Sequence, residues 1–381
     1  MIILARITWL ALTALNLAAL LFSGSILGLA LGLALLAVPA ASVLLNLAAR
    51  RRLRLRVSCP VNCAKNERMT VTVTAENGSA LPMPAIGFRI EVTNLLTGET
   101  QTVLRRTGAA PRGCGSAELE LSSSLCGRVR VRVYRVRLYD CFWLIPIGCG
   151  ASASAAVTVQ PDTFPMEAAI LANVNCPDDS EVYSQEKPGS DITETFQIRD
   201  YREGDSIRQI HWKLTTKFDR LISRDPSLPV TRSVLLLWER RSASAPAMQD
   251  AQAESLASLC RALLAQGAQF NVSWSEDGTG CLVQEIRDMD DFIGLMPRLL
   301  SAAPYAEGLS SAEAFCRAAG EGIFSHIVYI ADRVPPEAEG LRSLGRVTAL
   351  LCGDDSAAPD GFEVYSFNET DYVSRLMQLE I

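Results

Sequence analysis

Residues 199–213 read RDYREGDSIRQIHWK, the densest combination of charge, glycine and aromatic residues in the chain. Gly204 permits a tight turn, and Asp205 can cap the first free amide groups of a following helix. Apolar residues recur at helical spacing from Ile207 to Leu214. The stretch therefore predicts a turn that feeds a short amphipathic helix, held by charge-assisted hydrogen bonds among its own basic and acidic side chains.

A structural role for this stretch is favoured over a catalytic one. Its single histidine, His211, has no serine or cysteine beside it. Nucleophilic catalysis needs such a group next to its base. We therefore expect the segment to hold two soluble domains in a fixed relation.

The same stretch resembles the bacterial domain-of-unknown-function family fifty-eight, whose pattern is Arg-x-Tyr-x-x-Gly-Asp-x-x-Arg-x-Ile-x-Trp-Lys. The residues that match this family motif are Arg199, Tyr201, Gly204, Asp205, Arg208, Ile210, Trp212 and Lys213. Residues 139–144 and 157–161 are similar to two further stretches of the family. The resemblance implies a membrane-anchored protein with a β-sandwich and a von Willebrand A-like domain, often encoded beside a MoxR-type AAA ATPase.

The N-terminal 49 residues are strongly apolar. Residues 7–22 and 26–49 contain no Lys, Arg, Asp or Glu, and three small residues separate the two runs. Because a membrane helix needs about 20 apolar residues, we expect a transmembrane helical hairpin over residues 1–49. A cleaved signal peptide is the competing interpretation, but a polar mature domain would then follow the first apolar run.

Five arginines crowd the end of the second apolar run, namely Arg50, Arg51, Arg52, Arg54 and Arg56. The positive-inside rule places such a cluster in the cytoplasm. We therefore expect a two-pass protein of the cell membrane whose soluble domains are cytoplasmic. A lipid-headgroup site is another role for these arginines, whereas the net charge of −6 does not favour nucleic-acid binding.

The eleven cysteines are odd in number and irregular in spacing. Cys59 and Cys63 form the single close pair, and the two histidines, His211 and His326, lie far downstream of it. This spacing does not make a zinc site. Free thiols in a reducing compartment are expected instead.

Residues 50–161 predict an antiparallel, immunoglobulin-like β-sandwich. Apolar residues alternate with Thr, Arg or Glu, which is typical of strands with one solvated face. Turns are expected at Asn77-Gly78 and Thr97-Gly98. The expected strands are residues 69–74, 86–92, 118–121 and 129–133.

Residues 162–232 are expected to connect the domains and to carry the family motif, with a loop at residues 188–190. From residue 233 to 381, short apolar runs alternate with helical stretches, which indicates an α/β domain of Rossmann-like layout. The expected strands are residues 234–238, 270–274, 326–330, 347–351 and 362–367, and the expected helices are residues 251–266, 289–302, 311–319 and 370–379. Ligands of such sheets lie at the carboxyl ends of the strands.

The resemblance to von Willebrand A-like domains implies a metal site, Asp-x-Ser-x-Ser, after the first strand of this domain. Ser242 and Ser244 keep the hydroxyl spacing, but the acidic position falls on Arg240. Glu239 is the nearest carboxylate, and Asp332 resembles a later acidic position of the site. Since the charge of Arg240 opposes a cation, we expect a degenerate site with neither metal nor cofactor, in which Arg240 pairs with Asp332.

No nucleophile, base and oxyanion site form a recognisable set in the sequence. We therefore expect a non-enzymatic scaffold or adaptor, which by resemblance acts with a MoxR-type AAA ATPase in assembling or maturing envelope-associated complexes. One alternative is a metal-dependent hydrolase that uses Asp205, His211 and Asp332. Another is an outward-facing adhesion module, which requires the opposite topology.

Overall fold

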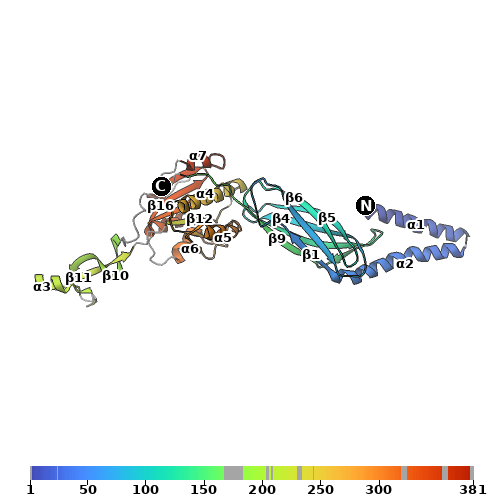
Figure 1. The fold of residues 1–381 in the computed structure, drawn as a ribbon, viewed down its shortest axis with the longest axis horizontal. Coiled ribbons are helices and arrows are strands. Elements are labelled where there is room, and N and C mark those ends of the chain that lie inside the picture. The colour runs from blue at the N-terminus through green and yellow to red at the C-terminus, as the bar shows by residue number, and fades with distance from the viewer. Residues whose placement is uncertain are drawn as a thin grey trace. The chain divides into compact units, whose positions relative to one another are not determined.

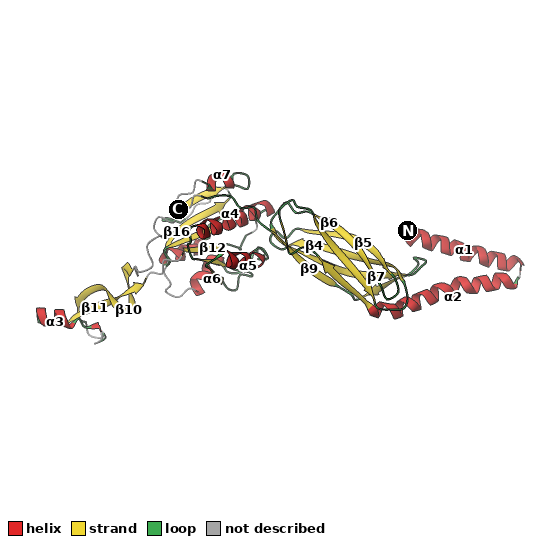
Figure 2. Cartoon of the chain, in the orientation of Figure 1, coloured by secondary structure: helices red, strands yellow, loops and turns green. Residues whose placement is uncertain are grey.

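The computed structural model describes residues 2–23, 25–166, 183–202, 206, 209–229, 234–242, 244–318, 324–353 and 359–377. The chain divides into two compact units, Met1–Pro161 and Asp162–Ile381. Figure 1 traces the chain from the N-terminal helices through the strands of the first unit to the mixed second unit. Figure 2 shows that strands dominate the sandwich, whereas helices and strands alternate near the C-terminus.

Two long apolar helices begin the chain, α1 (Ile2–Ser23) and α2 (Ile26–Ala49). Both are long and apolar enough to cross a membrane, and an apolar signal sequence would satisfy the same criterion. The hydroxyl of Ser25 caps α2 by accepting a hydrogen bond from the amide of Gly28 at 3.1 Å. At Gly32 a Cβ atom would lie 2.9 Å from Asn16 Oδ1, so glycine lets the two helices pack closely.

The predicted antiparallel sandwich is confirmed. Its strands are β1 (Leu53–Ser58), β2 (Asn62–Cys63), β3 (Met69–Asn77), β4 (Met83–Asn94), β5 (Thr100–Ala109), β6 (Cys114–Leu121), β7 (Gly127–Tyr139), β8 (Pro146–Cys149) and β9 (Ala153–Val159). One sheet has the order β1-β3-β6, and the other has the order β2-β9-β7-β4-β5 with β8 beside β7. Neighbouring strands are antiparallel, apart from the short parallel pair β2-β9.

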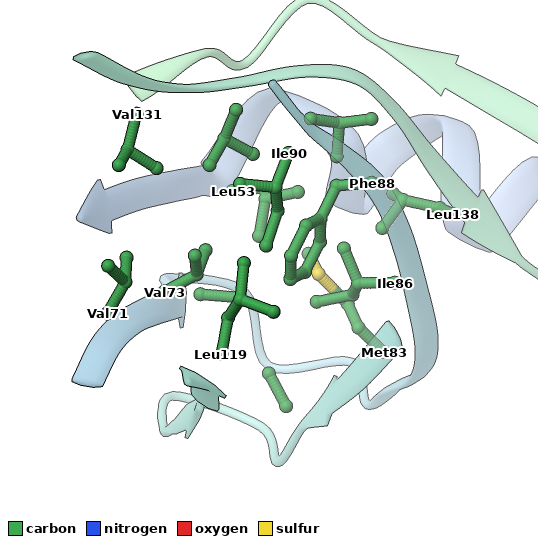
Figure 3. Packing of buried hydrophobic residues seen from close by; sticks show 14 of the residues in the cluster. Leu53, Val71, Val73, Met83, Ile86, Phe88, Ile90, Leu119, Val131 and Leu138 are labelled. Atoms are coloured by element: carbon green, nitrogen blue, oxygen red, sulfur yellow. The ribbon is translucent and has the colours of Figure 1, made fainter. Parts of the chain in front are cut away.

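The apolar residues that alternate along the strands of the sandwich form its core. Val71 and Val73 on β3 face Phe88 and Ile90 on β4, and Val131 on β7 completes the layer (Figure 3). All five side chains are fully buried. Burying one aliphatic or aromatic side chain contributes roughly 1.5–3 kcal/mol, so this layer is a main source of the domain's stability.

The second unit contains a mixed six-stranded sheet, as predicted for an α/β domain. Its strand order is β14-β13-β12-β15-β16-β17, parallel except for the antiparallel pair β13-β14. The strands are β12 (Val234–Trp238), β13 (Phe270–Trp274), β14 (Leu282–Ile286), β15 (His326–Ala331), β16 (Arg346–Cys352) and β17 (Glu363–Phe367). The helices are α4 (Pro246–Ala265), α5 (Met289–Leu299), α6 (Ser311–Ala318) and α7 (Tyr372–Leu376), with the 3-10 helix η4 (Pro336–Ser343).

Parts of the segment before this sheet form regular structure. The amide of Phe164 donates to Ser258 Oγ on α4 at 3.1 Å, so the chain packs on the α/β domain soon after Pro161. Farther along, β10 (Tyr183–Asp200) pairs antiparallel with β11 (Ile222–Pro229), and α3 (Trp212–Phe218) lies between them in sequence. The loop expected at residues 188–190 is wrong, because these residues belong to β10, at a place where its register with β11 shifts.

Candidate functional site

The topology of the sheet brings the predicted metal-site residues together at the carboxyl ends of two central strands, β12 and β15. The chain leaves β12 toward β13 on one side, whereas it leaves β15 toward β16 on the other. The carboxyl ends of β12 and β15 therefore form a topological switch point, the usual ligand position in such sheets. Residues 239–244 follow β12 and Asp332 follows β15, so both segments meet there.

Glu239 is a buried carboxylate that binds three donors. The amide of Ser311 donates to both carboxylate oxygens at 2.9 Å, the amide of Arg241 donates at 2.8 Å, and the hydroxyl of Tyr329 donates at 2.7 Å. Because Ser311 is the first residue of α6, the carboxylate also stabilises the positive end of that helix. Glu239 thus connects β12, β15 and α6.

Tyr329 is held in its neutral, donating form. Its burial raises the pKa of the phenol well above 10.0, and the nearby negative charge of Glu239 raises it further. A protonated hydroxyl is what the carboxylate needs as a donor. The pair therefore stabilises the site as a fixed hydrogen bond rather than as an acid and base.

Arg240 does not take the position expected from the sequence. Its buried guanidinium lies over the ring of Trp238, 4.2 Å from the ring centroid, and Nη2 donates to the carbonyl of Ala302 at 2.7 Å and to Gln249 Oε1 at 3.4 Å. Asp332 accepts a hydrogen bond from Ser242 instead. The expected pairing of Arg240 with Asp332 is wrong, because an aromatic face and a carbonyl oxygen hold the guanidinium.

The two serines and Asp332 do come together. Ser242 Oγ donates to Asp332 Oδ2 at 2.8 Å, and the two serine hydroxyls are hydrogen-bonded to each other. Asp332 Oδ1 is buried and has no hydrogen-bond partner among the described residues. The second carboxylate that a divalent cation would favour, that of Glu239, is bound to α6 and Tyr329. This donor set fits a hydrogen-bonded connection between β12 and β15 better than it fits a metal centre.

The described residues hold no group of three or more His, Cys, Asp or Glu side chains arranged for a metal ion. Cys63 donates to Glu67 Oε2 at 3.5 Å, and burial raises the pKa of the Cys63 thiol. Cys59 and Cys63 are both free thiols in the structure.

Arg199 and Tyr201, in the segment 199–213, contact β11 and the residue before it. Arg199 Nε donates to both carboxylate oxygens of Asp225 on β11, at 3.1 and 3.0 Å. The amide of Tyr201 donates to the carbonyl of Leu221 at 3.0 Å. Asp225 was not predicted as a partner of Arg199, since 26 residues separate the two and no pattern around Asp225 indicated a strand.

The helix within the motif begins later than expected. It starts at Trp212, and its N-cap is His211, whose Nδ1 accepts a hydrogen bond from the amide of Leu214 at 3.3 Å. The cap expected from Asp205 is therefore wrong for this helix. The other parts of the predictions for Gly204, Asp205 and Arg208 lie outside the described residues.

The hydrolase alternative needs His211 and Asp332 in one site. His211 caps α3, whereas Asp332 accepts from Ser242 at the edge of the sheet. No hydrogen bond or ion pair between these two side chains is present in the structure. Trp212 and Lys213, by contrast, are exposed on α3.

No protein-family model and no curated protein matches the chain. Among solved structures, the CARDB domain of a Pyrococcus furiosus protein, crystallised with di-metal ions, is 14% identical over 28% of this chain and 87% of its own, with a TM-score of 0.22. A cohesin module of a family 33 glycoside hydrolase from Clostridium perfringens is 5% identical over 29% of this chain and 98% of its own, with a TM-score of 0.23. These are distant likenesses to β-sandwich domains.

Proposed function

We propose that the chain is a membrane-anchored, non-enzymatic adaptor of the family-fifty-eight type. In this proposal α1 and α2 form a two-pass anchor in the cell membrane, and the soluble domains are cytoplasmic. The α/β domain is von Willebrand A-like with a degenerate metal site. The partner is a MoxR-type AAA ATPase, and the process is assembly or maturation of envelope-associated complexes.

The observation that carries the proposal is the exposure of large apolar side chains around the family motif. Trp212 is 61% exposed and Phe218 is 53% exposed, both on α3, while Ile198 and Leu221 are exposed on the chain that flanks it. Exposed aromatic side chains of this size are frequent anchors of protein interfaces. We call these four residues the α3 surface.

Charge around the α3 surface supports a protein partner. Lys213 and Lys217 are exposed on the same helix, and the ammonium group of Lys217 lies 5.7 Å from the ring centroid of Phe218. Basic side chains around an aromatic anchor favour an acidic partner and speed its association. The α3 surface is thus suited to a partner whose docking face combines apolar and acidic groups.

The closed geometry at the switch point supports a role without catalysis. Glu239, Arg240 and Ser242 are all buried, and each makes hydrogen bonds to neighbouring elements of the domain. A catalytic site would need a nucleophile and a base accessible to a substrate. The hydrogen bonds at these strand ends instead connect β12, β15 and α6.

The arginines after α2 support the cytoplasmic orientation, because Arg50–Arg52 directly follow the second apolar helix. An impermeant thiol reagent applied to intact cells tests it. We expect no labelling at the exposed Cys114, whereas prompt labelling would contradict the orientation and favour the adhesion alternative.

Site-specific photo-crosslinking in cells tests the proposed interface. A photoreactive phenylalanine analogue replaces Trp212 in one variant and Val283 in another, because Val283 is also apolar and exposed but lies on β14. We expect a crosslink to a AAA ATPase from position 212 and none from position 283. Equal crosslinking from both positions, or none from position 212, would contradict the α3 surface as the docking site.

A further inference from the structure

The loop between β7 and β8 is a preformed turn with an apolar tip. The side chain of the buried Asp140 accepts the amide of Phe142 at 3.2 Å and the amide of Ile145 at 2.8 Å. Trp143 adopts a left-handed backbone conformation with φ of 60°, and its amide donates to the carbonyl of Asp140 at 3.0 Å. These bonds fix the loop in a shape that leaves Phe142 and Trp143 half-buried and Ile145 47% exposed.

This loop contacts the start of the first apolar helix. The rings of Trp9 and Phe142 lie 5.0 Å apart between centroids, and Arg6 Nε donates to the carbonyl of Leu144 at 2.9 Å. Arg6 is the single charged residue of α1, near its N-terminal end. If α1 spans a bilayer, Arg6 stays at the edge of the hydrocarbon layer, and the loop that it binds lies at the same depth.

The second apolar helix fixes the same end of the sandwich. Ala49, the last residue of α2, and Leu53, the first residue of β1, are both buried in the sandwich core. Arg50 Nη1 donates to the carbonyl of Gly148 on β8 at 3.5 Å, and Cys149 Sγ donates to the carbonyl of Arg50 at 3.4 Å. With no flexible linker between helix and sandwich, β8 and its loop are held beside the end of α2.

The side chains at the end of the sandwich that carries the β7–β8 loop are of the types that concentrate at membrane interfaces. Trp143 stacks on Tyr139 with ring centroids 5.1 Å apart, and the guanidinium of Arg106 lies 5.1 Å from the Trp143 ring centroid. Tryptophan and tyrosine concentrate at the headgroup level of bilayers, and arginines there bind anionic lipids. A pocket of about 430 Å³ at the end of β8 is lined by Arg50, Arg51, Leu53 and residues 148–151, so two basic residues border a space open to a headgroup phosphate.

We propose that residues 140–145, together with Arg6 and Arg50–Arg52, form an interfacial anchor that inserts the side chains of Phe142, Trp143 and Ile145 into the headgroup layer of an anionic phospholipid bilayer. This inference rests on the proposed membrane anchor. The consequence is that the sandwich is seated on the bilayer surface instead of swinging freely on its helices.

Quenching of tryptophan fluorescence by lipid-borne nitroxide tests the inference. The full chain is reconstituted in phosphatidylglycerol-containing nanodiscs with a nitroxide near the headgroup end of the acyl chain. The contribution of Trp143 is the fluorescence intensity quenched in the native chain minus the intensity quenched in Trp143→Phe. The contribution of Trp9 is obtained in the same way from Trp9→Phe. Trp274→Phe is the control, because Trp274 is fully buried in the α/β domain and its loss should not change the quenched intensity.

We expect quenching of both Trp9 and Trp143, and loss of the Trp143 contribution in Ile145→Asp. The matched control is Leu104→Asp, which places the same charge at an exposed apolar site on β5 and should leave the contribution intact. Quenching of Trp9 without Trp143 would overturn the interfacial anchor while leaving the membrane helices in place. Absence of quenching at both positions would overturn the proposed membrane anchor itself.

Discussion

Glu239 shows how a position that resembles a metal site can serve as a structural connection. Its carboxylate receives amide donors from Arg241 and Ser311 and the hydroxyl of Tyr329. Hydrogen bonds to a buried charged acceptor are among the stronger ones in proteins. The negative charge that a cation would have required therefore binds hydrogen-bond donors of the protein itself.

Replacing Glu239 tests this connection. Glu239→Gln keeps the shape but turns an amide donor toward groups that are themselves donors, so we expect a loss of about 2–3 kcal/mol in the free energy of unfolding. Glu337→Gln is the control, because Glu337 makes a surface ion pair with Arg241, worth less than about 1 kcal/mol. Denaturant unfolding of the full chain in detergent measures both, and equal stability of the two variants would refute the role assigned to Glu239.

His326 gives the α/β domain a pH dependence. Its Nε2 lies 2.9 Å from Thr348 Oγ1, and burial, aided by the charge of Arg346, lowers the pKa of the imidazole from 6.5 to about 4. The unfolded chain therefore binds a proton at His326 before the folded chain does. The stability that the neutral imidazole provides is complete above pH 6.5 and is lost as the pH falls toward 4.

We expect this loss to amount to on the order of 2 kcal/mol. The non-titrating variant His326→Asn is compared with the native chain by denaturant unfolding across that pH range. The difference in the free energy of unfolding between the two proteins should decrease as the pH falls. A difference that stays constant would mean that His326 does not titrate differently in the folded and unfolded chains.

At the scale of elements, five strands of the α/β sheet were predicted to within one residue at each end, including the edge strand β17, whereas the edge strand β14 and the separate β10–β11 hairpin were not. Strand β12 is a continuous apolar run, as expected for a strand covered on both faces, and β13 buries four of its five residues. Strand β14 alternates partly exposed residues at an edge, and β10 and β11 carry prolines and charges, so neither pattern stood out. The β10–β11 hairpin depends on pairing between distant segments, which local periodicity does not reveal.

The β10–β11 hairpin contains Arg199, the first residue of the segment 199–213. Arg199 and Asp225 form a partly buried ion pair across β10 and β11, whereas Arg220 and Asp200 form an exposed pair nearby. We expect Arg199→Gln to destabilise the hairpin by about 1–2 kcal/mol and Arg220→Gln by less than about 0.5 kcal/mol. Hydrogen exchange of the β10 and β11 amides measures this, and similar exchange in both variants would show that the Arg199 pair does not hold the hairpin.

For the whole molecule, the sequence predicted the order of the parts: apolar helices, antiparallel sandwich, mixed α/β sheet. The resemblance to von Willebrand A-like domains had assigned Ser242, Ser244 and Asp332 to one degenerate metal site, and in the structure Ser242 is hydrogen-bonded to both Ser244 and Asp332. The sequence did not predict the position of Arg240, which depends on the ring of Trp238 and the carbonyl of Ala302. Such contacts are set by tertiary packing, and no local pattern encodes them.

The proposed function requires the chain to bind a MoxR-type AAA ATPase through the α3 surface. The most direct measurement is affinity capture of the full chain from crosslinked membranes, comparing the native protein with Trp212→Asp and with Ser242→Ala at the sheet edge. We expect a AAA ATPase to be captured with the native chain and with Ser242→Ala, and to be lost with Trp212→Asp while its hairpin stays folded by hydrogen exchange. Capture of the same amount of ATPase by Trp212→Asp as by the native chain would contradict the α3 surface as the docking site. Failure of the native chain to capture any AAA ATPase would contradict the proposed partner.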